Sequence, residues 1–186
     1  MRISTAAIAV AAPPPLQLAP EEEGALATYL AAHSSYDLHG AVGLMHALAS
    51  SPAPIPFTKW RSLVHRDEGA LSARDLIVFD HLLCVASTIV RVELGQRRPF
   101  APPSADAAAC ASFARGYLVG LELWPSSVPR VDRLRCAAWA CALGERLDLL
   151  PASDRARFRL TEEGRAALRR EIGRFIQLTH DIYALA

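Results

Sequence analysis

The stretch from Ala73 to Leu94, ARDLIVFDHLLCVASTIVRVEL, constrains the fold of this chain more than any other. Apolar residues recur along it at the three- and four-residue spacing of one helical face: Leu76, Phe79, Leu83, Ala86 and Val90. Leu82, Val85 and Ile89 widen this face to about half of the helix circumference. A helix that is apolar over so much of its surface must be surrounded by other elements. We therefore predict an all-α fold, a helical bundle around a central apolar helix at residues 73–94.

The rest of the chain predicts about six further helices to surround this one, seven in total. Their expected ranges are 21–33, 38–49, 59–64, 107–124, 130–146 and from 162 onward. Polar residues that can cap a helix precede five of the seven: Asp37, Thr58, Ser72, Ser104 or Asp106, and Thr161. No segment alternates strictly enough between apolar and polar residues to be a strand.

At 186 residues and 52% hydrophobic residues, the chain fits one domain with a single core. We expect this domain at residues 20–186, preceded by a flexible arm at residues 1–19 that is rich in alanine and proline. A signal peptide is the alternative for the arm, but its apolar core is short and runs straight into Pro13. No stretch reaches the length of a membrane span, so no membrane is expected as a partner.

The charges nearly balance, with 20 basic and 19 acidic residues and a net charge of +1. This balance disfavours a dedicated nucleic-acid or membrane-surface protein, which needs a concentrated basic field. Arginines do gather near the C-terminus, at Arg165, Arg169, Arg170 and Arg174, but glutamates are interspersed among them. A solvated helix face explains this pattern, and contact with an acidic partner or nucleic acid is the alternative.

The four cysteines, Cys84, Cys110, Cys136 and Cys141, each lie within an apolar helical pattern, and none forms a CxxC pair. This pattern predicts buried free thiols in place of disulfides or metal ligands. A reducing cytoplasm is the compartment that follows from it.

Two segments together resemble the YecA/YgfB-like family of uncharacterised bacterial proteins. The first is YDLHGAVGLMHALASSPAPIPFTKW, a helix with Leu-His-Gly, a proline-containing loop and a tryptophan that begins the next helix. The second is SFARGYLVGLELW, and the long apolar helix lies between the two. The resemblance covers residues 36–124, and its motif residues are Gly40, Trp60, Phe113, Gly116, Tyr117, Gly120 and Trp124.

The resemblance implies an all-helical fold and a cytoplasmic bacterial protein, without an established activity. Longer members of the family end in a zinc-binding tail that is rich in cysteine and histidine. This chain has no cysteine after Cys141 and ends in HDIYALA. The main reason to expect zinc is therefore missing, and we expect no cofactor.

Glycines lie inside two predicted helices, Gly40 and Gly43 in one and Gly116 and Gly120 in the other. Each destabilises a helix interior by about 1 kcal/mol relative to alanine, so some other requirement must retain it. Close approach of two helices is one such requirement, and access of a ligand to the backbone is the other.

Asp37, His39 and Arg115 are the candidate contacts for a ligand or partner. Arg115 interrupts an apolar run, and if it is buried it needs a carboxylate such as Asp37, Asp80 or Glu122. It serves either in a structural ion pair or in a ligand contact. His39 and His46 are seven residues apart, about 10 Å along a helix, which is too far for one metal ion to bridge.

No catalytic motif is present: the sequence has no GxSxG, no phosphate-binding glycine loop and no HExxH. The leading hypothesis is a non-enzymatic, protein-binding or regulatory module that uses an exposed groove or a loop such as SSPAPIPF or GQRRPFAPP. The alternative is a metal- or small-molecule-binding helical enzyme that uses His39, Arg115 and nearby carboxylates. Convergence of Asp37, His39 and Arg115 in a concave pocket would favour the enzyme, and an exposed apolar groove would favour the binding module.

Overall fold

The structure, a computed structural model, describes residues 16–66 and 71–184. Within these ranges it has ten α-helices, two short 3-10 helices and no strand, so the predicted all-α class is confirmed. The helices are α1 (Pro20–His33), α2 (Leu38–Ala49), α3 (Phe57–Val64), α4 (Ala73–Gly95), α5 (Ala107–Glu122), α6 (Arg130–Cys136), α7 (Ala138–Leu143), η2 (Leu147–Leu149), α8 (Ala152–Arg155), η3 (Ala156–Phe158), α9 (Glu162–Arg170) and α10 (Ile172–Tyr183). Of the arm predicted at residues 1–19, residues 1–15 lie outside the described part of the chain. Among the described helices α4 is the longest, at 23 residues, and neither it nor any other has the length and hydropathy to cross a bilayer.

Side-chain caps determine where four helices begin. In each case a side-chain oxygen accepts a backbone N–H from the first turn: Asp37 from Gly40, Ser72 from Asp75, Asp106 from Ala109 and Thr161 from Gly164. The cap expected at Thr58 is wrong, because α3 begins at Phe57, two residues before the predicted start, and Thr58 lies inside it. There Pro56 occupies the cap position with a φ of −60°, the value to which its ring confines it.

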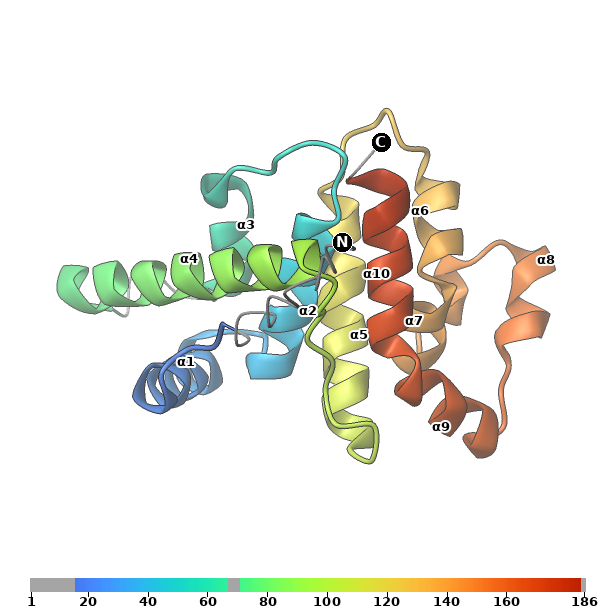
Figure 1. The fold of residues 1–186 in the computed structure, drawn as a ribbon, viewed down its shortest axis with the longest axis horizontal. Helices are drawn as coiled ribbons and strands as arrows, with labels where there is room; N and C mark the ends of the chain where they lie inside the picture. The colour runs from blue at the N-terminus through green and yellow to red at the C-terminus, as the bar shows by residue number, and fades with distance from the viewer. Residues whose placement is uncertain (1–15, 67–70, 185–186) are drawn as a thin grey trace, which may run out of the picture.

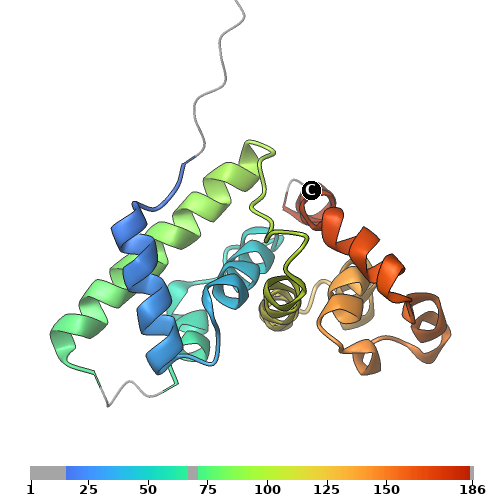
Figure 2. The same cartoon turned by 90° about the horizontal axis from the view of Figure 1, so that it is seen from below.

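The helices α2 and α5 form the centre of the molecule (Figure 1). They separate α1, α3 and α4 on one side from α6 to α10 on the other, as the view from below also shows (Figure 2). One hydrophobic cluster fills each side, and Val42 and Ala49 of α2 contact both clusters. The pair runs parallel, since its contacts advance in the same direction on both helices: Asp37 with Ser112, Gly40 with Gly116, and Ala47 with Trp124.

The central position predicted for residues 73–94 is not confirmed. The helix itself is present as α4 and buries Phe79, Leu83 and Val90 against α1 and α2. Its opposite face remains exposed, with Ile77 and Val78 accessible over 70% and 52% of their surface. Apolar residues on the outer face of α4 made the sequence pattern resemble that of an enclosed helix.

Two predicted helices are interrupted, and this explains most of the increase from seven helices to ten. The segment 130–146 divides at Ala137 into α6 and α7, and the C-terminal segment divides at Glu171 into α9 and α10. All six residues of α7 are buried, whereas α6 buries only two of its seven. The change of direction at Ala137 therefore lets α7 enter the core while α6 stays at its edge.

Glycines allow α2 and α5 to touch backbone to backbone. A Cβ atom added to Gly43 would overlap the carbonyl oxygen of Phe113, and one added to Gly116 would overlap the carbonyl oxygen of Gly40. A Cβ on Gly120 would lie 2.6 Å from the Cβ of Ala47. Close helix approach is therefore what these positions require. We call the contact of Gly40 and Gly43 with Gly116 and Gly120 the glycine seam.

The buried motif residues lie on both sides of this seam. Trp60 belongs to the cluster formed by α1 to α4, while Phe113, Tyr117 and Trp124 belong to the other. The indole Nε1–H of Trp124 donates to the carbonyl oxygen of Ala47, 2.8 Å away, and so ties the end of α5 to α2. All four cysteines are free, but only Cys110 and Cys141 are buried as predicted: Cys136 is half-buried, and Cys84 is exposed on the outer face of α4.

His46 is fully buried beside the seam. Its Nδ1–H donates to the carbonyl oxygen of Val42 at 2.9 Å, and its Nε2 has no hydrogen-bond partner among the described residues. Burial disfavours the charged imidazolium and lowers the pKa of His46 to about 4, although the bond to Val42 opposes this shift. The residue is therefore a neutral core histidine at pH 7.

Substitution of Gly116 by alanine should lower the free energy of unfolding by about 3 kcal/mol or more, because the added Cβ meets backbone that cannot rotate away. Gly24 is the matched control, since it lies in α1 with no other atom within 4 Å of an added Cβ. There Gly24→Ala should raise the free energy of unfolding by about 1 kcal/mol through helix propensity alone. Urea denaturation of both variants tests this, and equal effects would contradict the seam.

Lowering the pH should destabilise the protein through His46. The unfolded chain binds a proton near pH 6.5 and the folded chain only near pH 4, so stability present above 6.5 is lost as the pH falls between these values. The expected loss is about 3 kcal/mol. In His46→Asn, whose amide can replace the Nδ1–H, the free energy of unfolding should vary much less over this window. Denaturation at several pH values measures both slopes, and identical slopes would refute a buried neutral His46.

Candidate functional site

An apolar pocket of about 400 Å³ lies between α4, α2 and two loop segments. Its walls come from the segment that precedes α1, from the first turn of α1, from the inner faces of α2 and α4, and from the loop that follows α4. The lining residues are Leu16, Gln17, Leu18, Glu23, Leu38, Val42, Ala86, Ile89, Val90, Glu93, Arg98, Pro99 and Phe100. Nine of these thirteen are apolar, which favours apolar groups as occupants.

The rim of the pocket exposes two large apolar side chains, Leu16 and Phe100, which are accessible over 49% and 48% of their surface. Leu16 starts a segment that lies along the end of α4, and its backbone N–H donates to Oε1 of Glu93 at 2.8 Å. Leu18 packs against the cluster formed by α1 to α4. The protein thus already holds a short nonhelical segment of its own chain, residues 16–18, at this pocket.

Glu93 is one of three charged residues that line the pocket, with Glu23 and Arg98, and it is only 6% exposed. Its carboxylate pairs with the guanidinium of Arg98 in a two-point contact, Nε to Oε2 at 2.9 Å and Nη2 to Oε1 at 3.0 Å. Together with the N–H of Leu16, these contacts satisfy a carboxylate that would otherwise be costly to bury. The ion pair therefore adds little net charge to the pocket.

The turn after α4 brings Arg98 back over Glu93. Arg97 takes a left-handed conformation with a φ of 61°, and the backbone N–H of Arg98 donates to the carbonyl oxygen of Glu93 at 2.8 Å. This is the arrangement of a Schellman motif with arginine where glycine is usual. Arg97 also pairs with Asp181 of α10. The turn that leads into Pro99 and Phe100 is therefore bonded both to α4 and to α10.

The only ionisable residues among those that line the pocket are Glu23, Glu93 and Arg98. Among the thirteen described, none is Ser, Thr, Cys, His, Lys or Tyr. Outside the pocket, burial raises the pKa of Cys136 to about 11 and, with a smaller contribution from Asp148, that of Cys141 to about 11. These thiols stay protonated and unreactive at pH 7.

The three candidate contacts from the sequence do not converge. Asp37 caps α2, and its Oδ1 also accepts from the Ser112 hydroxyl at 2.6 Å. His39 is half-buried, and its ring lies over that of Phe100 with centroids 6.5 Å apart, outside the lining of the pocket. Arg115 is exposed on α5 and packs beside Gly144, just after α7.

The carboxylates expected to pair with Arg115 have other partners. Asp80 accepts from Nε of Arg61 at 2.8 Å, and Glu122 pairs with Arg130 at 2.8 Å. Because Arg115 is exposed, it does not need the buried partner that its apolar sequence context suggested. A second pocket, formed by residues from Ala142 to Arg165, also includes none of the three candidates.

A partly buried row of polar side chains that the sequence did not predict joins α1, the end of α3 and α4. The Tyr29 hydroxyl lies 3.1 Å from Nδ1 of His65, and Nε2 of His65 lies 3.1 Å from Oδ1 of Asp80. The side chain of His65 is fully buried, and none of the three residues lines either pocket. The row therefore holds three helices together without facing a cavity. Its members lie in α1, just after α3 and in α4, so no local spacing in the sequence could have revealed it.

In the described part of the chain, no group of three or more His, Cys, Asp or Glu residues could hold a metal ion. No protein-family model, curated protein or solved structure matches this chain. The candidate functional site is therefore the apolar pocket that contains the Glu93–Arg98 pair.

Removing the charge of Glu93 should destabilise the fold, because it leaves the Arg98 guanidinium without its carboxylate. We expect Glu93→Gln to lower the free energy of unfolding by about 2–3 kcal/mol. Glu122→Gln is the matched control, since Glu122 and Arg130 form a pair that is about half exposed on both sides. It should change the free energy by about 0–1 kcal/mol. Urea denaturation compares the two, and similar values would mean that the Glu93 pair is not structurally important.

Proposed function

We propose that this protein is a non-enzymatic, protein-binding module, and that the apolar pocket receives apolar side chains from an extended segment of a partner protein. The observation that carries the proposal is the pocket itself, with its apolar walls, its exposed Leu16 and Phe100, and its neutralised ion pair. The loop segment GQRRPFAPP, one of two loops that the sequence offered as a contact, supplies Arg98, Pro99 and Phe100 to it.

A peptide segment fits the site better than a free small molecule does. The volume alone suits either occupant. The rim, however, is built from two chain segments without helical structure, residues 16–18 and 98–100, beside which another extended segment can lie. The bond from the Leu16 N–H to Glu93 is an example, within this protein, of a peptide backbone that is recognised at the pocket.

The alternative, an enzyme that uses His39, Arg115 and nearby carboxylates, requires these groups to face one cavity. Asp37 and Arg115 have separate surroundings on different helices, and His39 packs against Phe100 outside the pocket lining. Nucleic-acid binding by the C-terminal arginines is also disfavoured. Several of these arginines pair with glutamates: Arg165 and Arg169 with Glu162, and Arg174 with Glu171.

We also propose that the chain is a YecA/YgfB-like protein of the bacterial cytoplasm. The motif residues support this, because Trp60, Phe113, Tyr117 and Trp124 are buried and two glycines of the motif, Gly116 and Gly120, make close helix contacts. Four free cysteines fit a reducing compartment.

Filling the pocket should abolish peptide binding without unfolding the protein. The probes are blocked hexapeptides that carry Leu-x-Leu, together with the same peptides in which serine replaces leucine. Ile89→Trp places a large ring in the pocket wall. It should lower the affinity for the Leu-x-Leu peptides at least about tenfold, because one leucine of the peptide can no longer be buried in the pocket. Titration followed by methyl NMR of the full chain measures the affinities.

Val131→Trp is the matched control, since Val131 is a partly exposed β-branched residue on α6, outside the pocket. It should leave peptide affinity unchanged, and both variants should unfold at denaturant concentrations close to that of the wild type. The proposed site would be refuted if the serine peptides bound as tightly as the Leu-x-Leu peptides, or if both variants lost the same affinity for the Leu-x-Leu peptides.

A further inference from the structure

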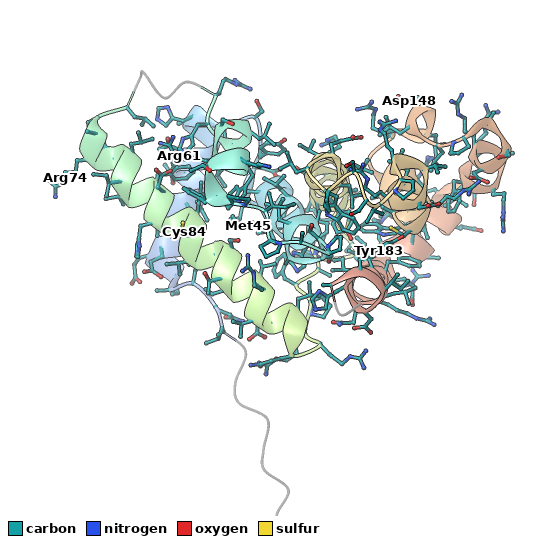
Figure 3. All side chains as sticks on the ribbon, turned by 90° about the horizontal axis from the view of Figure 1, so that it is seen from above. Met45, Arg61, Arg74, Cys84, Asp148 and Tyr183 are labelled. Carbon is teal, nitrogen blue, oxygen red and sulfur yellow. The ribbon has the colours of Figure 1, made fainter. Side chains whose placement is uncertain are left out.

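The outward face of α4 is a stripe of nine residues, of which seven are exposed and two, Val85 and Val92, are half-buried. We call it the outer stripe. It consists of Arg74, Ile77, Val78, His81, Cys84, Val85, Thr88, Arg91 and Val92, which point away from the buried residues of the same helix. Arg74 extends from one end of α4 and Cys84 lies near its middle (Figure 3). Ile77 is 70% exposed, a large exposure for an isoleucine within a helix.

The outer stripe carries basic residues but no carboxylate. The three acidic residues of α4 point elsewhere or are already bonded: Asp75 accepts from Ser72, Asp80 from Arg61, and Glu93 is buried with Arg98. Arg74 and Arg91 lie near the two ends of the stripe and are exposed, and neither forms an ion pair within the described residues. The stripe therefore combines apolar side chains with His81 and Thr88 along its length and is positively charged at both ends.

The stripe follows one side of α4. Ile77, His81, Cys84, Thr88 and Arg91 follow one another at four and three residues, so they line up along one side of the helix, with Ile77 and Cys84 as its apolar members. From Ile77 to Val92 the stripe is about 22 Å long, which corresponds to about four turns of a partner helix. The small side chains of Cys84 and Thr88 at its middle leave room for a larger apolar side chain of the partner.

We propose that the outer stripe binds an amphipathic helix of another protein, one whose apolar face is flanked by acidic residues. Apolar residues of the partner would pack on Ile77, Val78 and Val85, and its carboxylates would pair with Arg74 and Arg91. Charge complementarity of this kind sets partner choice and orientation in helix pairs. This surface is separate from the apolar pocket, which lies on the inner side of α4, so each proposal can fail without the other.

The charges argue against a second copy of this chain as the occupant. In an antiparallel pair with Cys84 opposite His81, Arg74 of each copy would face Arg91 of the other. In a parallel pair each arginine would face its own counterpart. Like charges that face each other destabilise a helix pair. An anionic membrane is also a poor match, because helices that lie on membranes present aromatic residues and many more Lys and Arg.

The test uses the full-length protein and two designed 18-residue helical peptides with the same leucine face, one flanked by glutamates and the other by lysines. Isothermal titration should show the acidic peptide binding at least about tenfold more tightly than the basic one, with a difference that shrinks at high salt. Ile77→Glu and Arg91→Glu should each lower the affinity for the acidic peptide at least about tenfold. Leu178→Glu, at an exposed leucine of α10, should leave its affinity unchanged.

Three other outcomes would overturn the proposal. The first is that the acidic peptide does not bind, or binds no better than the basic one. The second is that Leu178→Glu weakens binding as much as Ile77→Glu. The third is that Ile77→Glu abolishes an association of the protein with itself, seen by sedimentation, or with phosphatidylglycerol vesicles. Self-association would assign the stripe to a second copy of this chain, and vesicle binding would assign it to a membrane.

Discussion

The backbones of α2 and α5 touch at the glycine seam, and the positions of the other helices depend on this contact. No side chain separates the two helices at Gly43 and Gly116, so their distance and register are set by the main chain itself. Val42 and Ala49, beside the seam, contact both hydrophobic clusters. Val42 also lines the apolar pocket, so the geometry of the seam determines where this wall of the pocket stands.

Local features were predictable from the sequence, and relations between distant helices mostly were not. The caps at Asp37, Ser72 and Thr161 depend on residues three positions apart, and they were found correctly. The peripheral position of α4 was missed because Val85 and Ile89, which widen its apolar face in the sequence, are only half-buried, at the edges of that face. Periodicity reports which residues are apolar, but it does not report what covers them.

The Glu93–Arg98 pair at the pocket was missed for a related reason. Glu93 reads as the polar end of an apolar helix, and its partner Arg98 as part of a loop. Only the left-handed turn at Arg97 brings them together, and arginine is a rare residue at such a position. The possible burial of Arg115 was wrongly suggested by its apolar neighbours in the sequence, which face the core, while its own side chain faces solvent. The helix α4 therefore presents a pocket wall on one side and an uncovered stripe on the other.

The parallel seam also determines the order in which the molecule can assemble during synthesis. Gly43 and Gly116 are 73 residues apart, so α5 leaves the ribosome on the order of ten seconds after α2. During that interval α1, α3 and α4 can collapse onto one side of α2, while its glycine face has no partner. The contacts of the N-terminal cluster can therefore form before α5 is made, and docking of α5 is a long-range step because it joins residues far apart in the chain. Until α5 is made, the face of α2 that carries Gly40 and Gly43 lacks its partner helix and is exposed. A chaperone that binds the growing chain would therefore act most usefully in this interval.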